Sequence, residues 1–144
     1  ELAAGGLEHA LRDYAEEWSE RARVPVDCEC RNLGGMRLPP TVEGTLYRVA
    51  QEALANVQRH AQARHVSVLL EREASLVRLI VEDDGCGFDV DAWQKSPEAA
   101  QRLGLLGMQE RVALAGGTIV IESSPGAGTT ILVRLALPGE SRPT

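Results

Sequence analysis

The chain has 144 residues, of which 44% are hydrophobic, and a formal net charge of −6 at pH 7. This length suits a single domain, residues 1–144 with a core at about 6–138, that needs neither disulfides nor metals for stability. The acidic balance excludes a typical nucleic-acid backbone binder, and the apolar runs are too short to span a membrane.

The N-terminal half predicts a helix, a strand and a second helix. Residues 6–22 place apolar side chains at helical spacing, and residues 24–30 alternate apolar and polar side chains as short strands do. The glycines and prolines of residues 31–40 indicate a loop. A long helix is expected over about residues 41–63.

The C-terminal half predicts two strand pairs separated by a loop and a helix. Residues 65–72 and 76–83 read as a hairpin of two strands joined by a short turn. Residues 89–103 are polar and lack a clear period, which predicts a mobile loop with room for one helical turn. A helix over 105–115 ends at two glycines, and residues 118–138 form a second strand–turn–strand unit.

This order of elements predicts an α/β fold in two layers. The sheet is expected to be mixed and mostly antiparallel, with helices covering one of its faces.

The three cysteines, Cys28, Cys30 and Cys86, are an odd number without a second ligand pair, which favours free thiols in a reducing, cytoplasmic compartment. The first residues lack a signal sequence and are interpreted as a cut inside a longer protein, whose own membrane attachment stays open.

An acidic residue ends the second strand of the first hairpin. Because side chains alternate along a strand, Asp83 shares the face of Leu79 and Val81, which is expected to pack against the helices. A buried carboxylate needs hydrogen-bond donors. Gly85 and Gly87 follow and allow another molecule to approach the backbone, so a flat heterocycle with an exocyclic amine, such as adenine, fits here. The alternative is an ordinary Asp/Gly turn in which Asp83 caps a local N–H.

A polar stripe runs along the long predicted helix. Glu52, Asn56 and His60 stand at i, i+4 and i+8 and therefore near one face. An amide oxygen such as that of Asn56 suits Mg²⁺ that carries phosphate, and Glu52 could orient a metal-bound water or the attacking group. Arg59 and His60 could reach phosphates. The alternative is a solvated stripe with a local hydrogen bond at Asn56.

Two further features lie in the C-terminal half. Residues 104–108, "GLLGM", open a helix directly, and free N–H groups at a helix start can bind an anion. Gly104 and Gly107 would keep Cβ atoms away from it; the alternative is a flexible hinge. Thr129 is in phase with the apolar positions of the last strand, so its hydroxyl is expected to point inward beside Asp83.

These motifs, in this order, resemble the ATP-binding domain shared by sensor histidine kinases, gyrase-type topoisomerases, Hsp90-type chaperones and MutL, known as the Bergerat or GHKL fold. The sequence "LYRVAQEALANVQRHA" is similar to the N box of the NarX/DegS/DesK-like branch of sensor kinases. "VEDDGCGFD" and "GLLGMQERV" resemble the first and second glycine boxes, and "GAGTTILVRLALP" resembles the closing strand. Each motif is weak alone, but four in sequence are specific.

The resemblance implies roles for individual residues. Asp83 would receive the adenine amine, and Asn56 would ligate Mg²⁺ with Glu52 as its polar neighbour. Glu52, Asn56 and His60 form the implied catalytic group. The implied nucleotide-binding residues are Asn56, Arg59, His60, Asp83, Gly85, Gly87, Phe88, Gly104, Leu105, Leu106, Gly107, Met108 and Thr129. Asp84 stands where many relatives carry Asn, and its strand phase turns it away from the base.

The implied activity is that of a protein-histidine kinase that uses ATP and Mg²⁺. The γ-phosphoryl group would pass to a histidine on an upstream dimerisation domain that this chain lacks, and then to a response regulator, so the fragment alone would be nearly inactive. No nucleic acid and no direct membrane contact are expected for it. The alternatives are an anti-sigma-factor-type serine kinase and a non-catalytic nucleotide-binding domain of the same fold.

Overall fold

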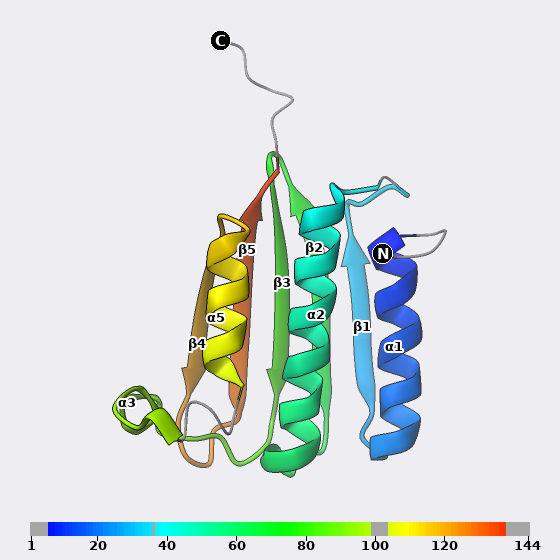
Figure 1. The fold of residues 1–144 in the computed structure, drawn as a ribbon. Helices are drawn as coiled ribbons and strands as arrows, with labels where there is room; N and C mark the ends of the chain where they lie inside the picture. The colour runs from blue at the N-terminus through cyan, green and yellow to red at the C-terminus, as the bar shows by residue number, and fades with distance from the viewer. Residues whose placement is uncertain (1–5, 36, 99–103, 138–144) are drawn as a thin grey trace.

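Five strands form one mixed sheet in the order β1-β2-β3-β5-β4 (Figure 1). The computed structural model describes residues 6–35, 37–98 and 104–137. β1 runs parallel to β2, and the other neighbouring strands are antiparallel. The strands are β1 (Val26–Arg31), β2 (Val66–Glu73), β3 (Leu76–Asp83), β4 (Thr118–Ser123) and β5 (Thr129–Ala136). The predicted fold class is confirmed.

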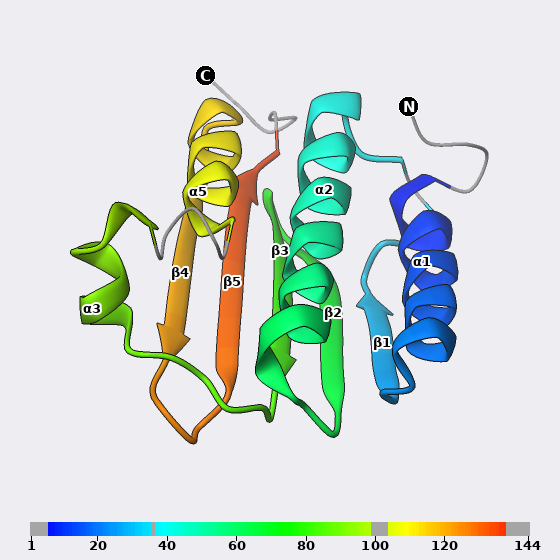
Figure 2. The same ribbon diagram turned by 60° about the horizontal axis from the view of Figure 1, so that its bottom comes forward.

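In the described part of the chain, three long helices lie side by side on one face of this sheet (Figures 1 and 2). They are α1 (Gly6–Ala22), α2 (Pro40–Asn56) and α5 (Leu105–Leu114). Strand alternation turns Val77, Leu79 and Val81 of β3 toward the helices, and all three are buried. The same alternation on β2 and β5 completes the core between the two layers.

The long predicted helix is confirmed, with a local change of geometry near its end. It is α-helical only to Asn56 and then widens into a π-helical turn, η1 (Val57–Ala61), after which Gln62 takes a left-handed conformation with φ +53°. A π-turn holds more residues than an α-turn and often occurs at functional sites. Periodicity over the preceding turns could not reveal this local widening.

The segment between β3 and α5 contains the helical turn for which the sequence left room. A short helix, α3 (Val90–Gln94), begins at Asp89, whose side chain accepts the N–H of Ala92 at 3.2 Å. Trp93 is buried and lies edge-on to Phe88. The rest of the predicted mobile loop, residues 99–103, lies outside the described residues, as do the expectations for residues 1–5 and for the chain end from 138.

A buried carboxylate anchors the loop that leads into α2. The Glu43 side chain is 3% exposed and accepts Arg37 Nη2 at 2.8 Å, Arg37 Nε at 3.1 Å and the N–H of Leu38 at 3.0 Å. The Arg37 guanidinium, more than the backbone N–H groups, holds the pKa of Glu43 below its ordinary value. This ion pair therefore fixes the loop against the first turn of α2.

Two smaller observations concern the thiols and the helices. Cys28, Cys30 and Cys86 are all free thiols, as expected. Among the residues that the structure describes, no helix is both long and apolar enough to cross a membrane.

Candidate functional site

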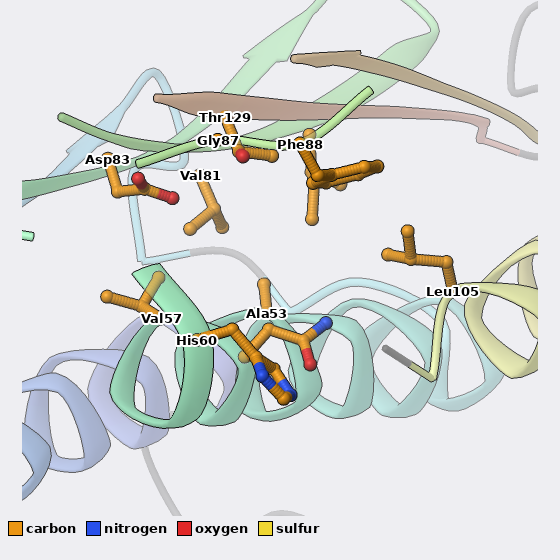
Figure 3. Close-up of a pocket in the computed structure, with 11 residues that line it drawn as sticks. Ala53, Val57, His60, Val81, Asp83, Gly87, Phe88, Leu105 and Thr129 are labelled. Atoms are coloured by element: carbon orange, nitrogen blue, oxygen red, sulfur yellow. The ribbon is translucent and has the colours of Figure 1, made fainter. Parts of the chain in front are cut away.

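A pocket opens between the C-terminal end of α2 and the ends of β3 and β5 (Figure 3). Figure 3 shows Asp83, Val81 and Thr129 on the strand side facing Val57 and Ala53 on the helix side. The lining residues are Ala53, Asn56, Val57, His60, Val81, Asp83, Gly87, Phe88, Leu105, Thr129 and Ile131. A mostly apolar wall with a few polar groups is typical of sites for small molecules.

Asp83 is the buried acid of this pocket. It is 8% exposed, and its Oδ1 accepts the N–H of Gly85 at 2.8 Å. Burial raises the pKa of Asp83, and the backbone N–H groups of Gly85 and Thr129 offset this only in part. An ionised carboxylate can accept about four hydrogen bonds, so these donors leave acceptor capacity for a ligand. Asp83 thus caps a local N–H, as in an ordinary Asp/Gly turn, and it also faces a cavity, as a ligand-binding acid would. Both interpretations of its position in the sequence therefore hold.

A hydroxyl network fixes what Thr129 can offer to this pocket. Ser123 Oγ accepts the N–H of Phe88 at 2.8 Å, donates to the carbonyl of Gly128 at 2.9 Å, and lies 2.9 Å from Thr129 Oγ1. A hydroxyl has one hydrogen, and since Ser123 gives it to Gly128, Thr129 must donate to Ser123. Thr129 therefore presents only lone pairs to the pocket.

Two acceptors thus stand beside each other in the strand wall of the pocket. Asp83 and Thr129 are directly paired across β3 and β5, and both line the cavity. A ligand NH₂ group has two hydrogens and matches such a pair. A carbonyl oxygen in the same place would face two other acceptor oxygens and would find no hydrogen-bond donor, so the pair selects against it.

The glycines around the end of β3 allow close packing between segments of the chain. Gly87 has φ +65°, and a Cβ there would lie 2.2 Å from the carbonyl oxygen of Ser124. A Cβ on Gly128 would lie 2.2 Å from the carbonyl oxygen of Asp83. These glycines let the β4–β5 turn pack against the end of β3. Gly87 also lines the pocket, whereas Gly85 contributes its N–H to Asp83.

The helix side supplies an amide and an imidazole. Asn56 and His60 both line the pocket, on either side of the point where α2 becomes η1. A π-turn holds more residues than an α-turn, so residues i and i+4 are offset by a smaller angle around the helix axis. This helps to keep Asn56 and His60 on the pocket side. The thiol of Cys86 donates to the carbonyl of His60 at 3.1 Å and ties η1 to the segment after β3.

Two of the predicted helix residues do not line the pocket. Glu52 lies one turn before Asn56, with its Oε2 3.8 Å from Arg48 Nε. Its Oε1 is 3.3 Å from the place that a Cβ on Gly104 would occupy, so Glu52 reaches the start of α5. Arg59 is exposed and stands outside the lining.

The residues that open α5 divide between pocket, core and surface. Gly104 takes a left-handed conformation with φ +68° directly before the helix. Leu105 is buried and lines the pocket, whereas Met108 is buried in the core and Leu106 is 51% exposed. A Cβ added at Gly107 would meet no atom within 4 Å, so the space beside this glycine is open.

Asp84 is turned away from the pocket, as its phase predicted. Its Oδ1 accepts the N–H groups of Arg64 at 2.8 Å and His65 at 3.0 Å, and these bonds lower the pKa of Asp84. Ser123, which supports the pocket wall through its bonds to Phe88, Gly128 and Thr129, is the residue that the local sequence patterns did not indicate. Its position opposite Thr129, on the neighbouring strand, was the signal that could have found it.

The donor set fits a magnesium ion that carries phosphate. Among the described residues, no three His, Cys, Asp or Glu side chains form a metal-binding cluster. Mg²⁺ needs no such cluster when substrate phosphates and water fill most of its coordination sphere, and one hard oxygen from the protein then suffices. Asn56 at the pocket wall carries that type of oxygen.

Comparison with known proteins adds independent information. A family described as "Histidine kinase-, DNA gyrase B-, and HSP90-like ATPase" matches residues 41–139. The signal transduction histidine-protein kinase/phosphatase DegS of Brevibacillus brevis is 35% identical over 136 residues, which is 94% of this chain and 33% of DegS. The sensor histidine kinase LiaS of Bacillus subtilis strain 168 is 35% identical over 141 residues, 98% of this chain and 37% of LiaS. The chain thus spans about a third of the length of these curated relatives.

Solved structures share the architecture. The blue-light activated histidine kinase of Erythrobacter litoralis EL346 has a TM-score of 0.70 and 20% identity, covering 94% of this chain and 43% of that chain. The catalytic domain of histidine kinase ThkA has a TM-score of 0.66 and 18% identity, covering 91% of this chain and 90% of that chain. At these identities the likeness concerns the fold.

Proposed function

This chain belongs to the histidine kinase-, DNA gyrase B- and HSP90-like ATPase family, and on that premise we propose that it is the ATP-binding catalytic domain of a sensor histidine kinase. The curated relatives named above are histidine kinases, and they match nearly the whole chain. The observation that carries the proposal is the buried carboxylate of Asp83, which faces a mostly apolar pocket with acceptor capacity to spare.

The base of ATP would lie against the strand wall of the pocket. Asp83 would accept one hydrogen of the adenine amine, and Thr129 would accept the other. The ring would lie between apolar side chains of the two layers, such as Val57 and Ile131. Burying the ring in this place removes apolar surface from water and fixes its orientation.

The phosphates would extend from the base toward the open mouth of the pocket. His60 and Asn56 stand on the helix side of this path, and Leu105 brings the start of α5 to the same cavity. The N–H groups at the start of α5 are suited to an anion, as is the left-handed turn at Gly104 that precedes them. Arg59 would contribute only long-range charge, since it stands outside the lining.

Asn56 would hold Mg²⁺ through its amide oxygen. The ion, when bound, supplies neutralisation of phosphate charge during transfer. The chain's own residues then have mainly positioning work, because phosphoryl transfer needs little covalent chemistry from the protein. Glu52, one turn away and engaged with Arg48, would orient the amide and the start of α5.

The acceptor would be a histidine on a dimerisation domain elsewhere in the parent protein, and a response regulator would receive the phosphoryl group next. This part of the proposal rests on the names of the relatives and extends to the whole protein, of which this chain corresponds to about a third. The parent would work in the cytoplasm, where ATP is available.

Two measurements test the proposal. Calorimetry of this chain with a non-hydrolysable ATP analogue should show saturable binding that strengthens with Mg²⁺, whereas a non-catalytic domain that has lost its site should bind nothing. The parent protein, incubated with γ-labelled ATP, should acquire an acid-labile phosphohistidine. An acid-stable phosphoserine on a partner would instead identify the serine-kinase alternative.

A further inference from the structure

The face of the sheet opposite the helices carries an ordered pattern of side chains. The long helices cover one face only (Figures 1 and 2), and no helix of the described residues covers the other. Strand alternation places every second residue of each strand on this second face. Cross-strand pairing then arranges those residues in rows that run across the strands.

The central row of this face is apolar over four neighbouring strands. Leu69 pairs with Ile80, Ile80 with Leu132, and Leu132 with Val120, and we call these four residues the apolar row. Val120 is 40% exposed, and the other three are half-buried by their neighbours. Glu29 continues the row at its β1 end, where Arg31 Nε donates to it at 2.8 Å. A continuous aliphatic row on an uncovered sheet face is typical of a surface that packs against another protein.

The two flanking rows carry opposite charge. The row on one side holds three arginines and one glutamate, and we call it the basic row: Arg31, Glu71, Arg78, Arg134 and Thr118. The row on the other side holds three acids and no base, and we call it the acidic row: Asp27, Ser67, Glu82, Thr130 and Glu122. Within the chain, Arg78 already pairs with Glu71 and Glu73, and Arg31 pairs with Glu29. The net positive charge of the basic row is therefore modest and rests mainly on Arg134. The face is apolar along its middle, weakly positive on one flank and negative on the other.

From this pattern we propose that the uncovered sheet face is a self-association surface that pairs with the same face of a second copy of this chain. A two-fold axis along the apolar row turns the second copy over and reverses its strands. The apolar row then packs on itself, and the basic row of each copy lies over the acidic row of the other. Face-to-face packing of two sheets with nearly aligned strands is a common arrangement.

The register of the strands makes the pairing specific. Arg78 of one copy lies over Glu82 of the second copy, because both residues belong to β3 and flank Ile80. Arg134 lies over Thr130 of the second copy, and Thr130 is paired with Glu82 on one side and Glu122 on the other. Arg134 therefore enters an acidic surrounding. A partner of uniform charge would match one flank and be repelled by the other, so a second copy suits the face best.

The proposal does not depend on nucleotide binding, because the pocket lies on the helix side of the sheet. Sedimentation velocity of the 144-residue chain, from low micromolar to the highest attainable concentration, should show a reversible monomer–dimer equilibrium. Leu132→Asp should weaken dimerisation at least about tenfold by placing a charge in the apolar row. Leu114→Asp is the matched control, because Leu114 is 90% exposed on α5, and it should leave the equilibrium unchanged.

Charge exchange tests the row-on-row register. Arg78→Glu and Glu82→Arg should each reduce self-association, since each variant opposes like charges across the axis. An equimolar mixture of the two should recover a heterodimer, because the exchanged charges then face opposite signs. Circular dichroism and the thermal midpoint should confirm that each variant is folded. A chain that stays monomeric, a dimer that survives Leu132→Asp, or a mixture without recovery would overturn the proposal.

Discussion

Asp83 and Thr129 are directly paired across β3 and β5 and present acceptor oxygens to one cavity. The pairing fixes their separation by the geometry of the sheet, so neither residue depends on a flexible loop for its position. The preference of the pocket for a ligand NH₂ group over a carbonyl oxygen therefore follows from the pairing of β3 with β5. This relationship leads to the first prediction.

ATP should bind at least about a hundredfold more tightly than inosine triphosphate, which carries an oxygen in place of the amine. The oxygen would leave both acceptors without a hydrogen and would face the lone pairs of Asp83 and Thr129. Competition between the two nucleotides for a fluorescent ATP analogue measures the ratio. Equal affinities would show that the amine is not recognised by this pair.

Replacing Asp83 by asparagine should abolish measurable nucleotide binding in calorimetry. The raised pKa of Asp83 means that its ionised form is disfavoured in the folded state, and stability from this residue is lost as pH rises through that pKa. Asp83→Asn removes the charge and keeps an oxygen for the N–H of Gly85, so the thermal midpoint at pH 7 should be unchanged or higher. Asp84→Asn, at the exposed neighbouring carboxylate, should retain binding.

Asn56→Ala should reduce the part of the nucleotide affinity that depends on Mg²⁺. In the wild-type chain, chelation of Mg²⁺ should weaken ATP binding, and in the variant the difference between the two conditions should shrink toward zero. Calorimetry with Mg²⁺ and with a chelator measures both values. Gln58→Ala, two residues on and exposed, is the control and should behave like the wild type.

Ser123→Ala should destabilise the wall of the pocket by about 1–3 kcal/mol. The substitution removes the acceptor of the Phe88 N–H, the donor to the Gly128 carbonyl and the acceptor of the Thr129 hydroxyl in one step. Urea denaturation measures the loss. Ser124→Ala is the control, because the Ser124 side chain is exposed and adjacent in sequence. It should change the free energy of unfolding by less than about 0.5 kcal/mol.

Glu43→Gln should lower stability at pH 7 by about 1–3 kcal/mol, because the amide keeps one acceptor oxygen, loses its charge, and turns an NH₂ group toward one of the donors that the carboxylate now accepts. The lowered pKa of Glu43 means that its contribution is present above the ordinary glutamate pKa and is lost as pH falls through the folded value. The difference between variant and wild type should therefore shrink below about pH 4 in urea titrations. Glu110→Gln, at an exposed site, should show no such convergence.

Local periodicity was enough to predict the fold class and the inward phase of Asp83, because both follow from alternation along strands and helical spacing. It could not give the role of Ser123, which depends on the register between β4 and β5 and hence on residues far from Asp83 in sequence. Nor could it give the reason for Gly87, where the limiting contact comes from the carbonyl of Ser124. Contacts between distant segments decide these features, and no local pattern records them.

The extra width of η1 also affects how this chain compares with other sequences. An i→i+5 turn accommodates one residue more than an i→i+4 turn, so the wider turn amounts to an insertion within a helix. Because i and i+4 share a face of an α-helix as well, Asn56 and His60 would stay on one side in a relative whose helix is uninterrupted. The added residue would displace only the chain that follows the turn, which is where Gln62 takes its left-handed conformation.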